Sequence, residues 1–276
     1  MSLSNLSMGM SGPTKGVGVV LTPLGVAMDW AARVTANGGT YSTDTYDAVL
    51  DYLIDLDLAG VLNKILYLNA RCGSDIIAAR TALIAVEGTG LDTATGTFAA
   101  WNELNGLVNS ASGIMDFGVK ADNARTTANN IYIGVYSLAD QAGLNAYAIG
   151  NTGSASGLLL RATSEYMIFD YAGRRSQTDV GNLPNGSKTK GQLAGSQTTA
   201  SVGGVFRNAA QIGNNNAVNA GAQRPNLNWR LVAANVTSGG EIISSGLTPT
   251  ECVNVSWAAH TFNVRLGRGV TAEGLF

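Results

Sequence analysis

Residues 131–136 read Ile-Tyr-Ile-Gly-Val-Tyr, and this run of β-branched and aromatic side chains predicts a strand. From about Ile114 onward the hydrophobic pattern keeps a period of two. The other predicted strands cover residues 145–149, 158–161, 166–169, 202–206, 230–236, 242–243 and 262–266. Of these, the second and third are close enough in sequence to form a hairpin. Short strands separated by Gly/Asn/Ser turns predict a mainly β chain with an antiparallel β-sandwich over residues 113–276.

The segment of residues 29–112 is predicted to be helical. One apolar stripe at helical spacing consists of Tyr46, Val49, Leu50, Leu53 and Ile54. The opposite face carries Asp44, Asp47, Asp51 and Asp55, which indicates a solvated surface rather than a calcium loop. A second short helix is predicted over residues 58–66 and a third over residues 75–87, with Gly88 as its stop. The three-residue spacing from Phe98 to Leu107 fits one or two further helical turns.

Residues 1–28 are predicted to form an extended N-terminal arm. The first twelve residues are mostly Ser, Met and Gly without periodicity, and Gly and Val then alternate before Pro23. Because glycine weakens an isolated strand, this segment is expected to gain order by adding to a neighbouring surface. A frayed terminus is the alternative. The residues expected to bind the partner chain are Val17, Val19, Val20 and Leu21.

The composition indicates a protein partly covered by other chains. The chain has 276 residues, 35 of them glycine, and only 13% are charged. A foldable chain this poor in charge has little electrostatic means of keeping neighbours apart. A monomeric β domain with an Asn/Thr/Ser surface is the alternative. The net charge of −2 argues against nucleic acid as a partner, and no run of 18 apolar residues predicts a membrane span.

The sequence predicts no catalytic, cofactor-binding or metal-binding residues. The single histidine, His260, falls in a predicted strand, where a structural role is expected. Cys72 and Cys252 are far apart and are expected to be buried thiols rather than zinc ligands. Glu165 and Asp170 lie five residues apart, hence on opposite faces of a regular strand, so they do not form a glycosidase pair.

Sugar binding without chemistry needs exposed aromatic rings that stack on sugar faces. The candidates for such glycan binding are Trp229, Trp257 and Tyr171. The same residues serve equally well in the core of a sandwich, and that alternative stays open at each position.

The segment Trp30-Ala31-Ala32-Arg33-Val34-Thr35-Ala36-Asn37-Gly38-Gly39 resembles the W-A-x-R-V-x-x-N-G-G helical segment of a group of bacteriophage virion proteins. In these capsid-decoration or tail-associated proteins the segment precedes a concanavalin A-like, or laminin-G-like, sandwich. Residues 63–68 continue the similarity, and residues 117–120, 131–136 and 147–150 look like the first three strands of that sandwich. The resemblance therefore implies an antiparallel concanavalin A-like (jelly-roll) β-sandwich behind an N-terminal α-helical segment.

The similarity covers roughly residues 29–266 and has no agreed catalytic residues to transfer. Members commonly finish with another amphipathic helix, whereas residues 271–276 show none, so we expect no equivalent C-terminal packing.

Together these observations predict a non-enzymatic virion structural protein. It would be held to major capsid or tail proteins through its arm, expose the sandwich, and form a homo-oligomer. The alternative is a receptor-binding, lectin-like tail module that recognises a host surface glycan. An enzyme ranks third.

Overall fold

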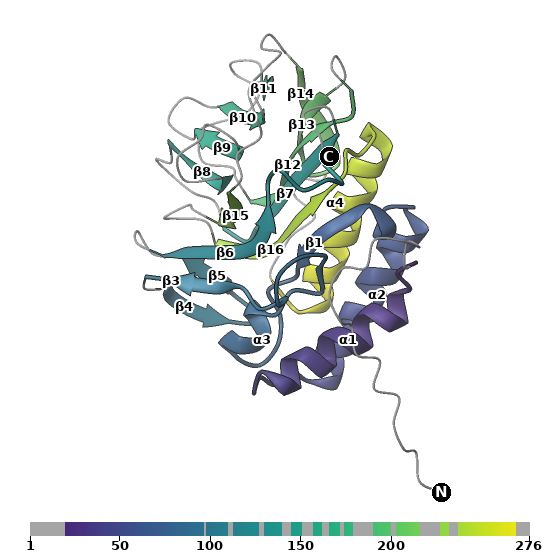
Figure 1. Cartoon of the computed structure of the whole chain (residues 1–276), viewed down its shortest axis with the longest axis vertical. Coiled ribbons are helices and arrows are strands. Elements are labelled where there is room, and N and C mark those ends of the chain that lie inside the picture. The colour runs from purple at the N-terminus through teal and green to yellow at the C-terminus, as the bar shows by residue number, and fades with distance from the viewer. Residues whose placement is uncertain are drawn as a thin grey trace, which may run out of the picture.

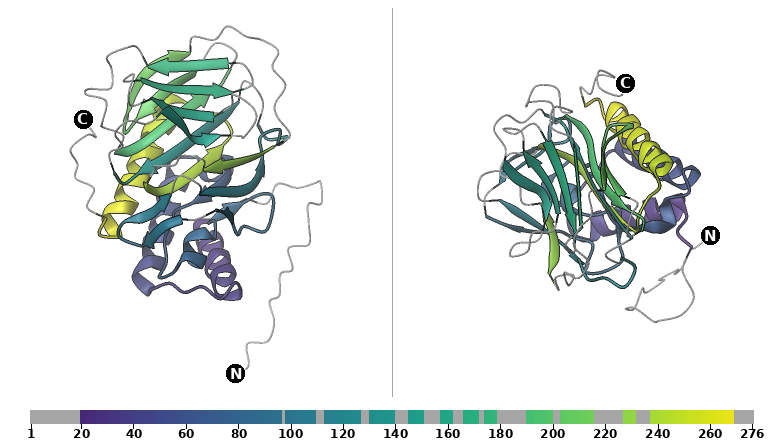
Figure 2. Two further views of the ribbon diagram at one scale, coloured as in Figure 1. Left: turned by 90° about the vertical axis from the view of Figure 1, so that its left-hand side faces the viewer. Right: turned by 90° about the horizontal axis from the view of Figure 1, so that it is seen from above.

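The structure is a computed structural model of the chain. It describes residues 20–96, 98–109, 113–126, 130–139, 145–150, 157–161, 166–171, 174–178, 190–199, 203–215, 227–231 and 237–268. Within these ranges a layer of helices packs against one face of a two-layered antiparallel sheet (Figures 1 and 2).

The helices are α1 (Pro23–Ala36), α2 (Thr43–Leu58), α3 (Ile76–Arg80) and α4 (Pro249–Arg265), with a short 3-10 turn η1 at Leu62–Lys64. The strands are β1 (Ile65–Asn69), β2 (Ile84–Ala85), β3 (Thr93–Thr95), β4 (Phe98–Asn102), β5 (Gly106–Asn109), β6 (Ile114–Lys120), β7 (Ile131–Ser137), β8 (Asn145–Gly150), β9 (Gly157–Arg161), β10 (Tyr166–Tyr171), β11 (Arg174–Thr178), β12 (Gly191–Gln197), β13 (Gly203–Arg207), β14 (Ala210–Asn215), β15 (Asn228–Leu231) and β16 (Thr237–Ser244).

The strands form one continuous series of antiparallel pairs. Its order is β2-β1-β16-β7-β12-β13-β14-β11-β10-β9-β8-β15-β6-β3, with β5 added to β16 and β4 added to β5. The series folds over so that its two halves face each other, as the right-hand view of Figure 2 shows. The predicted class, a mainly β chain with an N-terminal α-helical segment and a jelly-roll β-sandwich, is confirmed, as is the β9–β10 hairpin.

Strand β7 decides how the layers stack, because all seven of its residues are buried. Side chains alternate across a strand, so its two faces point into different cores. Ile131, Ile133 and Val135 join the core between the two sheet layers, with residues of β6, β8 and β15. Tyr132 and Tyr136 join the second core, beneath the helices. The stretch that predicted the sandwich is thus its central strand, covered on both sides.

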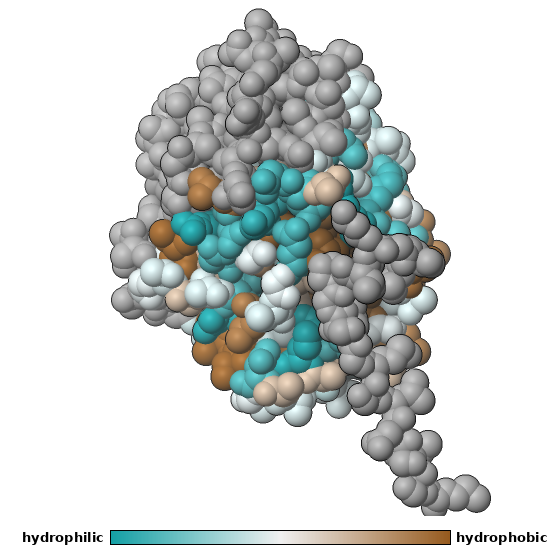
Figure 3. Space-filling model, viewed as in Figure 1, coloured by the Kyte–Doolittle hydropathy of each residue, from teal (hydrophilic) through white to brown (hydrophobic). Residues whose placement is uncertain are grey.

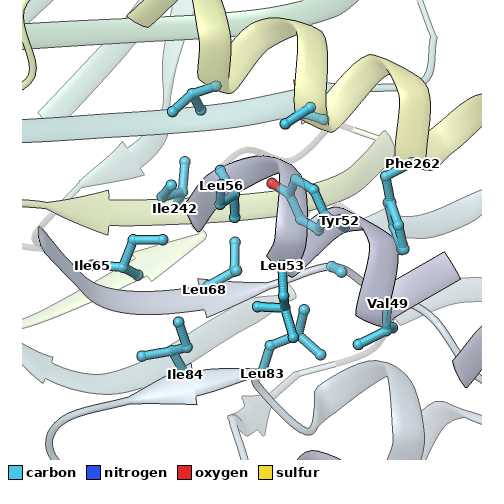
Figure 4. Close-up of a cluster of buried hydrophobic side chains, with 14 of the residues drawn as sticks. Val49, Tyr52, Leu53, Leu56, Ile65, Leu68, Leu83, Ile84, Ile242 and Phe262 are labelled. Carbon is cyan, nitrogen blue, oxygen red and sulfur yellow. The ribbon is translucent and has the colours of Figure 1, made fainter. Parts of the chain in front are cut away.

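The helical layer is fixed by apolar contacts with the sheet. Leu53 of α2 and Leu68 of β1 lie in one buried apolar cluster, and Phe262 of α4 approaches α2 (Figure 4). The Tyr52 and Phe262 rings stack with centroids 4.9 Å apart, which joins α2 to α4. Burying large side chains of this kind stabilises a fold by roughly 1.5–3 kcal/mol each.

The end of the chain differs from the sequence-based prediction. Residues 262–266 were predicted to be a strand, whereas Phe262 lies in α4, and the expectation of no C-terminal helix is wrong. The helix begins at Pro249 behind a capping box, in which Thr248 and Glu251 each satisfy the other's backbone N–H. Phe262, Val264 and Leu266 alternate as in a strand although they lie at the end of a helix, and this pattern gave the wrong prediction.

One predicted helix in the N-terminal part is wrong, and another is shorter than predicted. Residues 58–66 were predicted to be helical, but α2 ends at Leu58 and β1 pairs with β16, with Leu68 opposite Ile242. The helix predicted over residues 75–87 stops at Arg80 and is followed by β2. Pairing with a distant strand overrides local periodicity in such short apolar runs.

Two other predicted boundaries differ from those in the structure. The helical turns predicted around Phe98–Leu107 are the hairpin β4–β5, so residues 29–112 contain five strands besides their helices. At the other end α1 begins at Pro23, inside the predicted arm, with the Thr22 side chain capping it by accepting from the Gly25 N–H.

We predict that Phe262→Ala lowers the free energy of unfolding by about 3 kcal/mol, because it leaves a cavity between α4 and α2. The control Val264→Ala, on the outer side of the same helix, should change it by less than about 0.5 kcal/mol. Urea denaturation measures both, and equal effects would show that α4 does not pack as described.

Candidate functional site

Two of the predicted partner-binding residues of the arm lie among the described residues, and these two neighbours differ in exposure. Val17 and Val19 lie outside the described residues. Val20 is 74% exposed, whereas Leu21 packs against the helical core and its backbone N–H donates to Asn63 Oδ1 at 2.8 Å. The arm is therefore tied to the body at Leu21, and Val20 is free to contact another molecule.

The outward face of α1 continues from Val20 as an apolar stripe. Leu24 is 55% exposed and Met28 is 58% exposed, and the four-residue spacing places them on one side of the helix. Ala32 follows at the same spacing and is exposed too. The large apolar side chains of a surface helix normally point toward the protein core. A row of them on the solvent-exposed side therefore indicates a surface that another chain covers.

Helix α2 extends this apolar surface. Leu58 is 82% exposed, and Ile54 is exposed one turn before it. The Leu21–Asn63 hydrogen bond places the start of α1 beside the end of α2, so Val20 and Leu24 lie at the same end of the helix pair as Leu58. We call this surface the α1–α2 face, and it consists of Val20, Leu24, Met28, Ile54 and Leu58. Figure 1 shows the two helices side by side on the helical side of the molecule.

The predicted glycan-binding residues are not brought together. Trp229 of β15 is fully buried in the core between the sheets, so its ring offers no surface for a sugar. Trp257 is 39% exposed on α4, edge-on to the His260 ring. Tyr171 ends β10, and its side chain lies outside what the structure describes. The core alternative therefore holds for Trp229, and Trp257 is the remaining described candidate.

His260 belongs to α4 rather than to a strand. Its Nδ1 lies 3.1 Å from the Tyr136 hydroxyl of β7, and burial lowers the pKa of His260. The residue joins the helix to the sheet through this contact.

A group of ionisable side chains lies buried on the sandwich-facing side of β1 and β16, next to the stacked rings of Tyr67 and Phe117. Arg71 has no exposed surface, its Nη1 lies 2.7 Å from Asp92 Oδ2, and its Nε donates to Glu241 Oε2 at 2.8 Å. The Tyr67 hydroxyl donates to the same Asp92 oxygen at 2.7 Å. We call these four residues the Arg71 centre.

The Arg71 centre holds two carboxyl groups for one guanidinium. Burial raises the pKa of both Asp92 and Glu241, and the nearby Arg71 opposes that rise. Asp92 Oδ2 also accepts from Asn69, and Glu241 Oε1 accepts from Ser238, whereas Asp92 Oδ1 has no hydrogen-bond partner in the described part of the chain. Two carboxyl groups around one cation favour retention of a proton by the pair.

A second buried guanidinium braces the segments around the Arg71 centre. Arg268 donates to the backbone carbonyls of Glu103 and Gly239 and to that of Arg71, and burial lowers the pKa of Arg268 to about 10. These bonds tie the β4–β5 hairpin, β16 and the end of β1 to the segment after α4. A hydrogen bond to a charged group stabilises by roughly 1.5–3 kcal/mol, so this network serves to fix the fold.

The cavity beside this junction is too small for a substrate. Its volume is about 10 Å³, and its lining includes Tyr52, Tyr136, Gln192 and Glu241. Such a volume holds about one water molecule. The Arg71 centre is therefore a buried brace, and the sequence could not reveal it because its members lie up to 174 residues apart in the chain.

Cys72 and Cys252 are free and buried, as predicted, and burial raises the pKa of each thiol to about 12. The described residues contain no cluster of three or more His, Cys, Asp or Glu that could hold a metal ion. None of the helices in these ranges is long and apolar enough to cross a bilayer. Glu165 lies outside the described residues, and so does the side chain of Asp170.

No protein-family model and no curated protein sequence matches this chain. One solved structure that it resembles is domain 4 of AbnA, an extracellular GH43 arabinanase from Geobacillus stearothermophilus, in complex with arabinotriose. The two are 14% identical with a TM-score of 0.48, and the match covers 70% of this chain and 98% of that domain. A likeness at this level supports no functional conclusion.

We predict that Arg71→Met destabilises the protein by about 3–5 kcal/mol, because it leaves two buried carboxyl groups without their cation. Asp92→Asn keeps the shape and the acceptor for Tyr67, and should cost about 1 kcal/mol. The control Arg265→Met removes a half-exposed ion pair with Asp51 and should cost less than about 1 kcal/mol. Urea denaturation ranks the three variants, and an Arg71 variant no worse than the control would contradict the buried brace.

The raised pKa of Asp92 also predicts a pH dependence. A carboxyl group whose pKa is higher in the folded state binds more protons there, so its stabilising effect is present at acid pH and is lost as pH rises through that pKa. The stability of the wild type relative to Asp92→Asn should therefore fall as pH rises above about 4, the usual pKa of an aspartate. A difference that grows with pH would mean that the pKa of Asp92 is lowered instead.

Proposed function

We propose that this chain is a non-enzymatic structural protein of a bacteriophage particle, held in place through its N-terminal end. The observation that carries the proposal is the row of exposed apolar side chains at Val20, Leu24 and Met28, where the leading residues join the body. The resemblance of residues 30–39 to virion proteins points in the same direction. The partners would be major capsid or tail proteins, together with further copies of this chain.

The binding free energy of one such apolar contact is small, so attachment would rely on many linked copies of the chain. Burial of each exposed Leu or Met side chain contributes roughly 1.5–3 kcal/mol, from which the ordering of the joined segments is subtracted. One such contact is weak, but symmetric copies that are themselves linked multiply it. A rigid sandwich braced by the Arg71 centre would then project from the particle.

The described geometry favours this role over its alternatives. A lectin-like module needs accessible aromatic rings, and the burial of Trp229 removes one of the three candidates. An enzyme needs an accessible site, whereas the ionisable cluster found here is closed to solvent.

We predict that deletion of residues 1–19 leaves a folded protein that no longer enters particles. The cut precedes Pro23, where α1 begins, so the helix and its Thr22 cap survive. Each variant would be supplied to an infection that lacks the wild-type gene, and its amount in purified particles measured by immunoblot. Full-length Leu24→Asp with Met28→Asp should also be depleted, and the control Leu104→Asp should not. Normal incorporation of both the deletion variant and the Leu24/Met28 variant would refute the proposed attachment.

A further inference from the structure

The helix pair that carries the α1–α2 face is strongly acidic. Residues 23–58 contain six of the chain's 19 acidic residues and one of its 17 basic residues. The rest of the chain therefore has 13 acidic and 16 basic residues, a net positive charge. Residues 23–58 thus carry a net charge of −5, and the remaining residues carry a net charge of +3.

Much of that charge has no partner within the protein. Asp29 pairs with Arg33 at 2.9 Å, and Asp51 pairs with Arg265 of α4. Asp44, Asp47 and Asp57 are exposed and form no ion pair with any described residue. The unpaired carboxylates lie on α2, the same helix that exposes Ile54 and Leu58.

Acidic and apolar residues occupy different halves of one side of α2. Asp47, Asp51, Ile54 and Leu58 follow the spacing i, i+4, i+7 and i+11, which is one side of a helix. The carboxylates occupy the first half of this side and the apolar residues the second half. The apolar half lies at the same end of the helix pair as Val20 and Leu24, because the start of α1 lies near the end of α2.

We propose that the α1–α2 face binds a basic, amphipathic helical segment of another protein. Its apolar side chains pack on Leu24, Met28 and Leu58, and its Lys or Arg side chains lie over Asp44 and Asp47. Charge complementarity selects this occupant over a second copy of the face, because two such acidic surfaces repel each other. The proposal rests on the proposed function in that the segment belongs to a neighbouring protein of the particle.

The test uses the full chain and a synthetic amphipathic helix of leucine and lysine that carries a fluorescent label. A twin peptide has glutamate in place of every lysine. Fluorescence anisotropy should show that the lysine peptide binds, that its affinity falls as salt rises, and that the twin binds at least about tenfold more weakly. Equal binding of the twins, or no binding of the lysine peptide, would overturn the proposal.

Two pairs of substitutions separate the apolar from the electrostatic contribution. Leu24→Ser with Leu58→Ser, and Asp44→Asn with Asp47→Asn, should each weaken binding about tenfold. Leu104→Ser is a matched control, since Leu104 is 56% exposed but lies at the β4–β5 turn, and Asp122→Asn is the control for charge. A similar loss in the controls would show binding elsewhere on the molecule.

Failure of this inference differs from failure of the proposed function. If the lysine peptide binds as described but the deletion variant enters particles normally, the binding face stands without the arm attachment. If the deletion variant is excluded and the peptide does not bind, attachment uses the leading residues with a partner of different chemistry.

Discussion

The buried guanidinium of Arg71 ties α3 and the segment before β3 to the sandwich face of β16, and the arrangement of the remaining elements depends on that junction. Its side chain contacts Asp92 ahead of β3, Glu241 on β16 and the Ala79 carbonyl of α3. These groups come from three separate parts of the chain, and none of them reaches solvent. Because a buried charge without its partners is costly, the segments cannot part without a large penalty.

Apolar packing holds the outer helical surface on the opposite face of that sheet. Helices α1, α2 and α4 rest on a sheet whose central strand is covered on both faces, and Arg268 adds bonds to carbonyls from three segments. The α1–α2 face is therefore presented in a fixed geometry. Figure 3 shows that hydrophilic and hydrophobic residues are interspersed on the visible side of the described part. The packing of the helices thus defines the shape of the α1–α2 face, so a binding partner does not have to order this surface.

The sequence predicted the sandwich but not its connections. The strand at residues 131–136 was recognisable because β-branched and aromatic side chains dominate it. The C-terminal helix was missed although Thr248, Pro249 and Glu251 provide a capping signal, because the apolar pattern after it was taken for a strand. Strands β1 and β2 could not be predicted, since only their pairing with β16 and with each other distinguishes them from helix. The sequence also did not reveal which arm residue is exposed, because Val20 and Leu21 are both apolar and only the fold exposes the first and packs the second against the core.

A reconstruction of the whole particle tests the central claim most directly, since it locates every copy of this chain and what touches it. We expect density from a neighbouring protein, helical and rich in basic residues, over α1 and α2, with the sandwich projecting away from it. A particle in which α1 and α2 face solvent while the sandwich makes the attachment would contradict the claim.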